Sequence, residues 1–139
     1  MYNEVLISGS KDNKIRVWNM TSDRQLFEAS HESTVWCVKI INKMIISSGD
    51  KTVRIWNLED GKLLHKLKLP SWCNNFDLNS EKTILAVAHH EGVSIWDFEN
   101  RIQISEIELN KVNDVRFNEP GTTLVVGQFD GQVSKIDLY

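Results

Sequence analysis

The sequence is poor in the residues that mark several classes of protein. Only two of its 139 residues are cysteines, Cys37 and Cys73, and neither lies in a Cys-x-x-Cys or Cys/His ligand pattern. The adjacent pair His89-His90 likewise lacks acidic or cysteine partners at ligand spacing. This shortage argues against a disulfide-stapled scaffold and against a zinc-binding module. We therefore expect two reduced thiols in a cytosolic or nuclear protein, with no metal site and no cofactor.

Long apolar runs and an excess of positive charge are missing as well. No apolar stretch approaches the length of a membrane span, and no signal-peptide pattern opens the sequence. Lys and Arg number 16 against 19 Asp and Glu, and both signs are scattered along the chain. Without a basic stripe to neutralise phosphates, we expect no nucleic-acid partner, and we expect no membrane partner either. The 41% apolar and 25% charged fractions are those of an ordinary soluble domain.

Helical periodicity is also lacking, and short β-rich runs take its place. These runs alternate with a period of two and are separated by clusters of Asn, Asp, Gly, Ser or Pro. The only prolines, Pro70 and Pro120, fall between runs. There the missing amide hydrogen of proline removes no hydrogen bond between strands. The pattern predicts strands over Val5–Gly9, Lys14–Asn19, Gln25–Ala29, Val35–Ile41, Met44–Ser48, Val53–Leu58, Leu63–Leu69, Trp72–Leu78, Ile84–Ala88, Val93–Phe98, Ile102–Leu109, Val112–Phe117, Thr123–Val126 and Val133–Leu138.

A repeat with a period near 40 residues organises these strands. One column of the repeat recurs at intervals of 38, 40 and 40 residues, at Trp18, Trp56, Trp96 and Ile136. A second column lies six residues before the first and consists of Asp12, Asp50, His90 and Asp130. A period of this length with an aromatic residue before Asp or Asn is typical of a β-propeller. The sequence therefore predicts an all-β propeller array of about three and a half four-stranded blades.

The strands divide the chain into two complete and two partial blades. The four strands of a propeller blade are lettered a to d from the central channel outward. Residues 1–29 supply strands b, c and d of the first blade, and residues 110–139 supply strands a, b and c of the last. Residues 30–69 and 70–109 each supply four strands. We expect one continuous array over residues 1–139, without a linker or a second domain.

The repeats resemble those of the WD40-repeat family over essentially the whole chain. The similarity is strongest at Lys51-Thr-Val-Arg-Ile-Trp56-Asn57, good in the first and third repeats, and weaker in the fourth. Two segments are most similar to the WD40 domains of F-box proteins: Met44-Ile-Ile-Ser-Ser-Gly-Asp50 and Asp60-Gly-Lys-Leu-Leu-His65.

The resemblance implies a structural tetrad of hydrogen-bonded Asp, His, Ser or Thr, and Trp in each blade. The second blade carries all four residues: His31, Ser47, Asp50 and Trp56. The other blades retain parts of the set: Ser8, Asp12 and Trp18 in the first, Trp96 in the third and Asp130 in the fourth. Since the tetrad lies inside a blade and leaves no exposed hydroxyl, we interpret it as structural rather than as a hydrolase triad, and we expect no enzyme.

The resemblance also implies a binding face at the channel mouth, formed by the d–a and b–c loops. The positions that point there in the family are Lys11, Thr34, Trp36, Gly49, Trp72, Asn74, His89, Lys111, Asn113 and Phe129. Exposed Trp and Phe are residue types that anchor protein interfaces. The alternative is that Trp36 or Trp72 packs between blades. None of the ten positions is Arg, which argues against a phosphopeptide pocket of the F-box type.

These observations favour a non-enzymatic scaffold or adaptor that binds a peptide or protein at the channel mouth. An alternative is the substrate-receptor propeller of an F-box-type ubiquitin ligase, and a further one is a propeller fragment that only self-associates. Too few blades are present to close a ring. We therefore expect completion either by self-association or by the remainder of a longer WD40 chain, of which this would be the C-terminal half.

Overall fold

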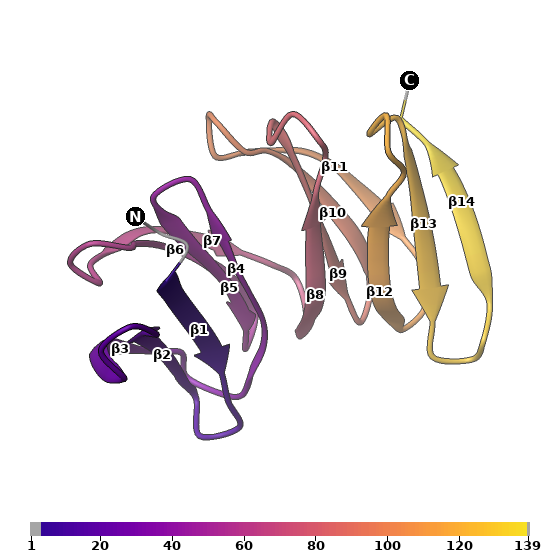
Figure 1. Ribbon diagram of the computed structural model, residues 1–139. Coiled ribbons are helices and arrows are strands. Elements are labelled where there is room, and N and C mark those ends of the chain that lie inside the picture. Colours follow the sequence, from indigo (N-terminus) through magenta and orange to yellow (C-terminus); the bar gives the residue numbers. More distant parts are fainter. Residues whose placement is uncertain (1–3, 139) are drawn as a thin grey trace. The chain divides into compact units, whose positions relative to one another are not determined.

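The computed structural model describes residues 4–138 and is built from β-strands. These residues form fourteen strands in four antiparallel sheets (Figure 1), which confirms the predicted all-β fold. The chain divides into two compact units, residues 1–68 and residues 69–139, each holding two of the sheets.

The first unit contains a three-stranded and a four-stranded sheet. The first sheet has the order β1-β2-β3 and comprises β1 (Val5–Gly9), β2 (Lys14–Asn19) and β3 (Arg24–Ser30). The second has the order β4-β5-β6-β7 and comprises β4 (Val35–Ile41), β5 (Met44–Gly49), β6 (Thr52–Asn57) and β7 (Leu63–Lys68). Apolar side chains of both sheets meet in a buried cluster of Ile15, Val17, Val35, Ile45, Trp56 and Leu58.

The second unit mirrors this composition in reverse order. The third sheet has the order β11-β10-β9-β8, made of β8 (Cys73–Leu78), β9 (Ile84–His89), β10 (Gly92–Asp97) and β11 (Ile102–Glu108). The fourth has the order β12-β13-β14, made of β12 (Val112–Phe117), β13 (Thr123–Gln128) and β14 (Val133–Asp137). Its buried cluster comprises Ala86, Ala88, Val93, Ile95, Val112, Val115, Leu124 and Val126.

The strand register makes positions in different sheets directly comparable. Trp18 lies opposite Leu6, Trp56 opposite Ile45, Trp96 opposite Leu85 and Ile136 opposite Leu124. In the three sheets that have an outer strand, a β-bulge occurs just before the Trp position. Bulges re-aim the side chains that follow them. Because this irregularity recurs at one column, structural equivalence can be assigned residue by residue.

Candidate functional site

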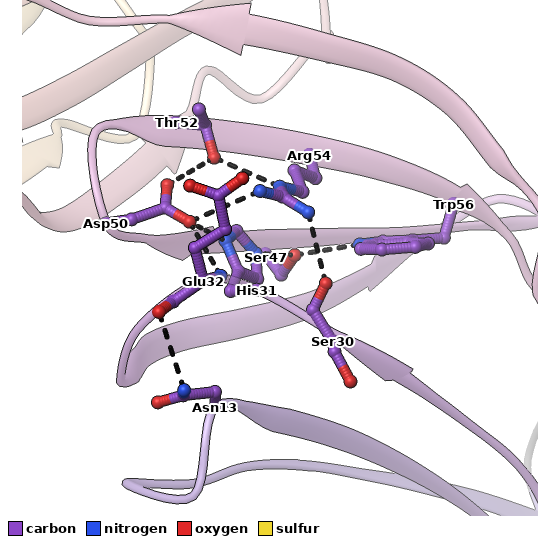
Figure 2. A network of polar contacts seen from close by, with 9 residues as sticks. All are labelled: Asn13, Ser30, His31, Glu32, Ser47, Asp50, Thr52, Arg54 and Trp56. Carbon is purple, nitrogen blue, oxygen red and sulfur yellow. Dashed lines mark hydrogen bonds and ion pairs between the residues drawn. The ribbon is translucent and has the colours of Figure 1, made fainter.

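A buried polar network links the segment after β3 to the turn after β5 in the second sheet (Figure 2). His31 Nδ1 lies 3.3 Å from Asp50 Oδ2, and His31 Nε2 lies 2.7 Å from Ser47 Oγ. Trp56 Nε1 donates to the same Ser47 oxygen at 2.9 Å. The four side chains assigned to the tetrad are thus in contact with one another.

The chemistry of the partners fixes the direction of each hydrogen bond. An indole N–H only donates and a carboxylate only accepts, so Trp56 donates to Ser47 and His31 Nδ1–H donates to Asp50. Nε2 of the neutral His31 ring then accepts a hydrogen bond from the Ser47 hydroxyl. Burial, followed by the charge of Arg54, lowers the pKa of His31 from 6.5 to about 4, which keeps this arrangement neutral.

Asp50 is the point at which the network branches. Its Oδ1 accepts from Thr52 Oγ1 at 2.6 Å, and its Oδ2 accepts from the Glu32 amide at 3.0 Å and from Arg54 Nη2 at 3.3 Å. Burial raises the pKa of Asp50, but the hydrogen bonds from Thr52 and the Glu32 amide outweigh it, and the pKa is lowered overall. Asp50 also adopts a left-handed φ of 46°, which Asp tolerates in tight turns.

Ser47 has no access to a substrate. Its side chain is completely buried, and its oxygen contacts both His31 and Trp56. A serine nucleophile needs an exposed oxygen and nearby oxyanion donors. The network therefore acts in positioning the loop and the turn.

The third sheet contains a different buried network, centred on His89. Nδ1 of His89 lies 2.8 Å from Ser71 Oγ and 3.2 Å from the Glu91 amide nitrogen. On the other side of the ring, Nε2 lies 2.6 Å from Glu106 Oε1 and 3.0 Å from Ser94 Oγ. Since the Glu91 N–H donates to Nδ1, the imidazole carries its proton on Nε2 and donates it to the carboxylate.

His89 differs from the sequence-based expectation, which placed it among partner-facing positions. Its exposure is 0%, so no partner reaches it in this structure. His89 occupies the column of Gly49, because His89 pairs with Gly92 as Gly49 pairs with Thr52. A Cβ on Gly49 would lie 3.0 Å from His31 Nδ1. His31 stands four residues before β4, and the corresponding residue of the third repeat, four residues before β8, is Leu69. The buried imidazole of the third sheet is instead that of His89, which belongs to β9.

The remaining tetrad positions have other surroundings. In the third sheet, Val87 occupies the place of Ser47, and the buried Trp96 Nε1 has no partner within the described residues. In the first sheet, the exposed Asp12 is hydrogen-bonded to Arg16, which lowers the pKa of Asp12 to about 2. In the fourth, the exposed Asp130 accepts from the Gln132 amide at 3.0 Å.

The other partner-facing positions lie on loops and strand ends of both units. In the first unit Lys11 and Trp36 are exposed and Thr34 is half-buried; the Trp36 residue is 58% exposed. In the second unit Trp72 and Phe129 are 47% and 59% exposed. Asn113 and Lys111 are exposed, whereas half-buried Asn74 donates to the Val112 carbonyl at 2.7 Å.

Backbone hydrogen bonds join the loops of the second unit into one edge. The His90 amide donates to the Trp72 carbonyl, the Lys111 amide to the His90 carbonyl, and the Phe129 amide to the Lys111 carbonyl, at 2.7–3.2 Å. The His90 ring also meets the Phe129 ring edge-on, with centroids 6.2 Å apart. We call this set of residues (Trp72, His90, Lys111, Asn113 and Phe129) the loop edge.

Next to the loop edge lies an open groove of about 620 Å³ that the sequence did not reveal. Its lining is mostly polar, with two apolar side chains. The lining residues are Pro70, His90, Glu91, Glu106, Glu108, Leu109 and Asn110. The groove thus presents carboxylates beside His90 of the loop edge. The sequence pattern did not predict a role for Glu106 and Ser94 in the His89 network. The corresponding positions of the second sheet are occupied by Lys66 and Arg54.

Comparison with known proteins supports the same fold and repeat. The family model described as "WD domain, G-beta repeat" matches residues 2–19 and 24–57, which confirms the WD40 resemblance. Small ribosomal subunit protein RACK1y of Oryza sativa subsp. japonica is 25% identical over 92% of this chain and 42% of its own length. Eukaryotic translation initiation factor 3 subunit I of Drosophila virilis is 24% identical over 97% and 48%. THO complex subunit 3 of Arabidopsis thaliana is 28% identical over 84% and 40%.

A solved structure agrees on the fold. The crystal structure of the computationally designed Ika4 protein matches with a TM-score of 0.87 and 21% identity, over all of this chain and 88% of its own. The chain spans less than half the length of the three natural relatives, two of which are named as subunits of complexes.

Two features are absent from residues 4–138. No helix there is long and apolar enough to cross a membrane. No group of three or more His, Cys, Asp or Glu side chains is placed to hold a metal ion in that range.

The depressed pKa of His31 predicts acid sensitivity. Between pH 6.5 and about 4 the unfolded chain binds a proton at this histidine and the folded chain does not, so acidification favours unfolding. The full contribution is present above pH 6.5, and up to about 3 kcal/mol is lost as the pH falls to 4. Urea denaturation across this range should show a steeper loss for the wild type than for His31→Gln. Replacement of the exposed His65 is the control; parallel curves for the wild type and His31→Gln would contradict the assignment.

The burial of His89 predicts a large difference between two adjacent histidines. His89→Ala removes the buried imidazole and its hydrogen bonds with Ser71 Oγ and Glu106 Oε1, and it should lower the free energy of unfolding by about 1–3 kcal/mol. His90→Ala, at the exposed neighbour, should change it by no more than about 0.5 kcal/mol. Thermal denaturation of both variants measures the difference, and equal effects would argue against the His89 network.

Proposed function

We propose that this chain is a non-enzymatic WD40-type scaffold that binds a protein or peptide partner at the loop edge of its second unit. The observation that carries the proposal is the pair of large aromatic side chains, Trp72 and Phe129, held half-exposed on loops that are hydrogen-bonded to one another. Rigid exposed aromatics bury much surface at little entropic cost, and such residues dominate interface energies.

The polar neighbours of these aromatics support a protein ligand. Lys111 and Asn113 supply hydrogen-bond donors beside Trp72 and Phe129, and the adjoining groove offers the carboxylates of Glu91 and Glu108. An apolar anchor ringed by polar groups is the usual anatomy of a protein interface. Trp36 of the first unit is a separate candidate contact, with Lys11 and Thr34 near it in the repeat pattern.

A second part of the proposal concerns completion of the array. The chain covers 48% or less of the natural relatives described above. The first and fourth sheets have three strands each where the second and third have four, and unpaired strand edges invite association. We propose that a second copy or the remainder of a longer chain completes the array, in the cytosol or nucleus.

Removal of the aromatic anchors tests the binding face. Trp72→Ala combined with Phe129→Ala should reduce capture of partner proteins from cell extract by at least about tenfold, since hot-spot residues contribute 2 kcal/mol or more. Trp36→Ala tests the first unit in the same way. Ile102→Ala, a 61% exposed residue of β11, is the matched control for lost apolar surface. Unchanged capture by a folded variant lacking Trp36, Trp72 and Phe129 would refute the proposed interface.

Light scattering of the purified chain tests association. We expect a particle of at least twice the 16.0 kDa chain mass, because the open strand edges would otherwise remain in water. A soluble, well-folded monomer would contradict completion of the array by self-association, and it would leave the binding-face experiment unaffected.

A further inference from the structure

Three glutamates concentrate negative charge in the open groove next to the loop edge. Glu91, Glu106 and Glu108 all line this groove of about 620 Å³, and all three residues are exposed. None of them forms an ion pair with a lysine or arginine of residues 4–138. We call this site the acidic groove. Because carboxylates that lie close together repel one another, a cationic partner would lower the electrostatic energy of the groove.

Glu106 is held in place by neutral hydrogen-bond donors. Its Oε1 lies 2.6 Å from His89 Nε2, and its Oε2 accepts from Ser94 Oγ and from Gln103 Nε2, the latter at 2.8 Å. These donors fix the direction of the carboxylate and leave its negative charge uncancelled. An acceptor that is already oriented loses little side-chain entropy when a partner binds. Glu106 is therefore prepared to receive a cation.

Lysines occupy the same three columns in the second sheet. The strand registers of the two sheets correspond, since Lys68 lies opposite Thr52 as Glu108 lies opposite Gly92. All three lysines are exposed, and we call them the lysine face. The corresponding pairs are Lys51 and Glu91, Lys66 and Glu106, and Lys68 and Glu108. The two four-stranded sheets thus carry opposite charges at equivalent positions.

The first sheet balances the charge of one of these columns by itself. Glu28 occupies the column of Lys66, because Glu28 lies opposite Arg16 as Lys66 lies opposite Arg54. The Glu28 carboxylate forms ion pairs with Lys14 and Arg16 of the neighbouring strand. The fold therefore requires no particular sign of charge at this column, and a balanced arrangement is possible within one sheet.

The lysine face lacks such a balance. Lys66 and Lys68 form no ion pair within residues 4–138. Lys66 also lies directly opposite Arg54, and like charges at opposite positions of two strands are destabilising. The second sheet thus has uncompensated positive charge at the columns where the third sheet has uncompensated negative charge. Each surface supplies the charge that the other lacks.

The spacing of the charges also matches. Lys66 and Lys68 stand two residues apart on β7, and Glu106 and Glu108 stand two residues apart on β11. Side chains at such positions point to the same face of a strand and lie about 7 Å apart. Two ammonium groups of β7 can therefore meet two carboxylates of β11 at the same time.

We propose that two copies of this chain associate through these surfaces, with the lysine face of one copy bound in the acidic groove of the other. The ammonium groups meet the carboxylates, and the lysine alkyl chains pack against Pro70 and Leu109 of the groove lining. All six charged residues lie in the two four-stranded sheets and their turns. The contact therefore goes beyond the proposed completion of the array, which concerns the three-stranded sheets, and it does not use the aromatic residues of the loop edge.

Salt dependence tests whether charge drives this association. The mass of the full chain, measured by sedimentation velocity over a concentration series, should rise to that of a dimer or larger at low salt. Raising the ionic strength from about 0.05 M to about 0.5 M should weaken the association at least about tenfold, because salt screens exposed charges. Association that is unchanged or stronger at high salt would contradict a contact between charged surfaces.

Two charge-reversal variants test the residues. One carries Glu91→Lys and Glu108→Lys, and the other carries Lys51→Glu and Lys68→Glu. Each substitution introduces the residue that the other sheet holds in the same column, so both variants should keep the fold. Each variant alone should associate at least about tenfold more weakly than the wild type, since its two surfaces no longer have opposite charge. An equimolar mixture of the two should recover the association to within about threefold, because oppositely charged surfaces meet again.

A matched control places the same charge change at the other end of the second sheet. Lys43→Glu combined with Lys62→Glu alters two exposed lysines in the turns before β5 and β7, away from the turn that contains Lys51. The net charge changes as in the variant of Lys51 and Lys68, but the association should stay within about twofold of the wild type. The control separates the effect of the two surfaces from that of the net charge.

Other outcomes would overturn the proposal. A wild-type chain that stays monomeric at millimolar concentration and low salt would do so, and it would also contradict completion of the array by self-association. Association that persists in both charge-reversal variants would be assigned to the strand edges, which leaves the proposed completion intact. Failure of the mixture to recover the association would exclude the pairing of these two surfaces. A monomeric chain that binds a blocked peptide of residues 62–69 in the acidic groove would indicate a basic segment of another protein as the occupant.

Discussion

The architecture of the first unit depends on one buried neutral imidazole. His31 lies between the carboxylate of Asp50 and the hydroxyl of Ser47, so that a residue outside the strands is bonded to a turn and to the middle of a sheet. Removal of any partner would leave a buried donor or acceptor without a hydrogen bond, which costs more than the bond itself contributes. Through Asp50, the same arrangement holds the Glu32 amide and the Arg54 guanidinium, which reaches the Ser30 carbonyl. The route of the chain from the first sheet into the second is set by these contacts.

The third sheet meets the same requirement with residues in different columns. His89 enters from a strand where the second sheet has glycine, and it bonds the turn at Glu91, the loop at Ser71 and the outer strand at Glu106. The consequence for function is local. Trp72 follows Ser71, and His90 follows His89, so the buried network holds the backbone from which the exposed loop edge projects. A binding surface on loops requires such support, because free loops would lose entropy on docking.

The strands and the complete network of the second sheet follow from the sequence because their signals are local. Turn residues mark the strand ends, and His31, Ser47, Asp50 and Trp56 stand at their family positions. The burial of His89 does not follow, because a repeat column does not specify the neighbours of its side chain, and Gly49 and His89 share a column but not their surroundings. A side chain at Gly49 would meet both the Thr34 carbonyl oxygen, at 2.8 Å, and the His31 ring, at 3.0 Å, so what this column can hold depends on its neighbours in the loop before β4. The acidic groove does not follow either, because residues far apart in the sequence, such as Pro70 and Glu108, meet there only in the folded chain.

Native-state amide hydrogen exchange at two residues tests the central claim most directly. Glu32 and Glu91 lie outside the strands, and their amides donate to side chains of the buried networks, Asp50 in one case and Ser71 with His89 in the other. If the networks hold the loops to the sheets, both amides should exchange as slowly as those of the neighbouring strands. Exchange at the rate of open loops, while the strands stay protected, would contradict the account.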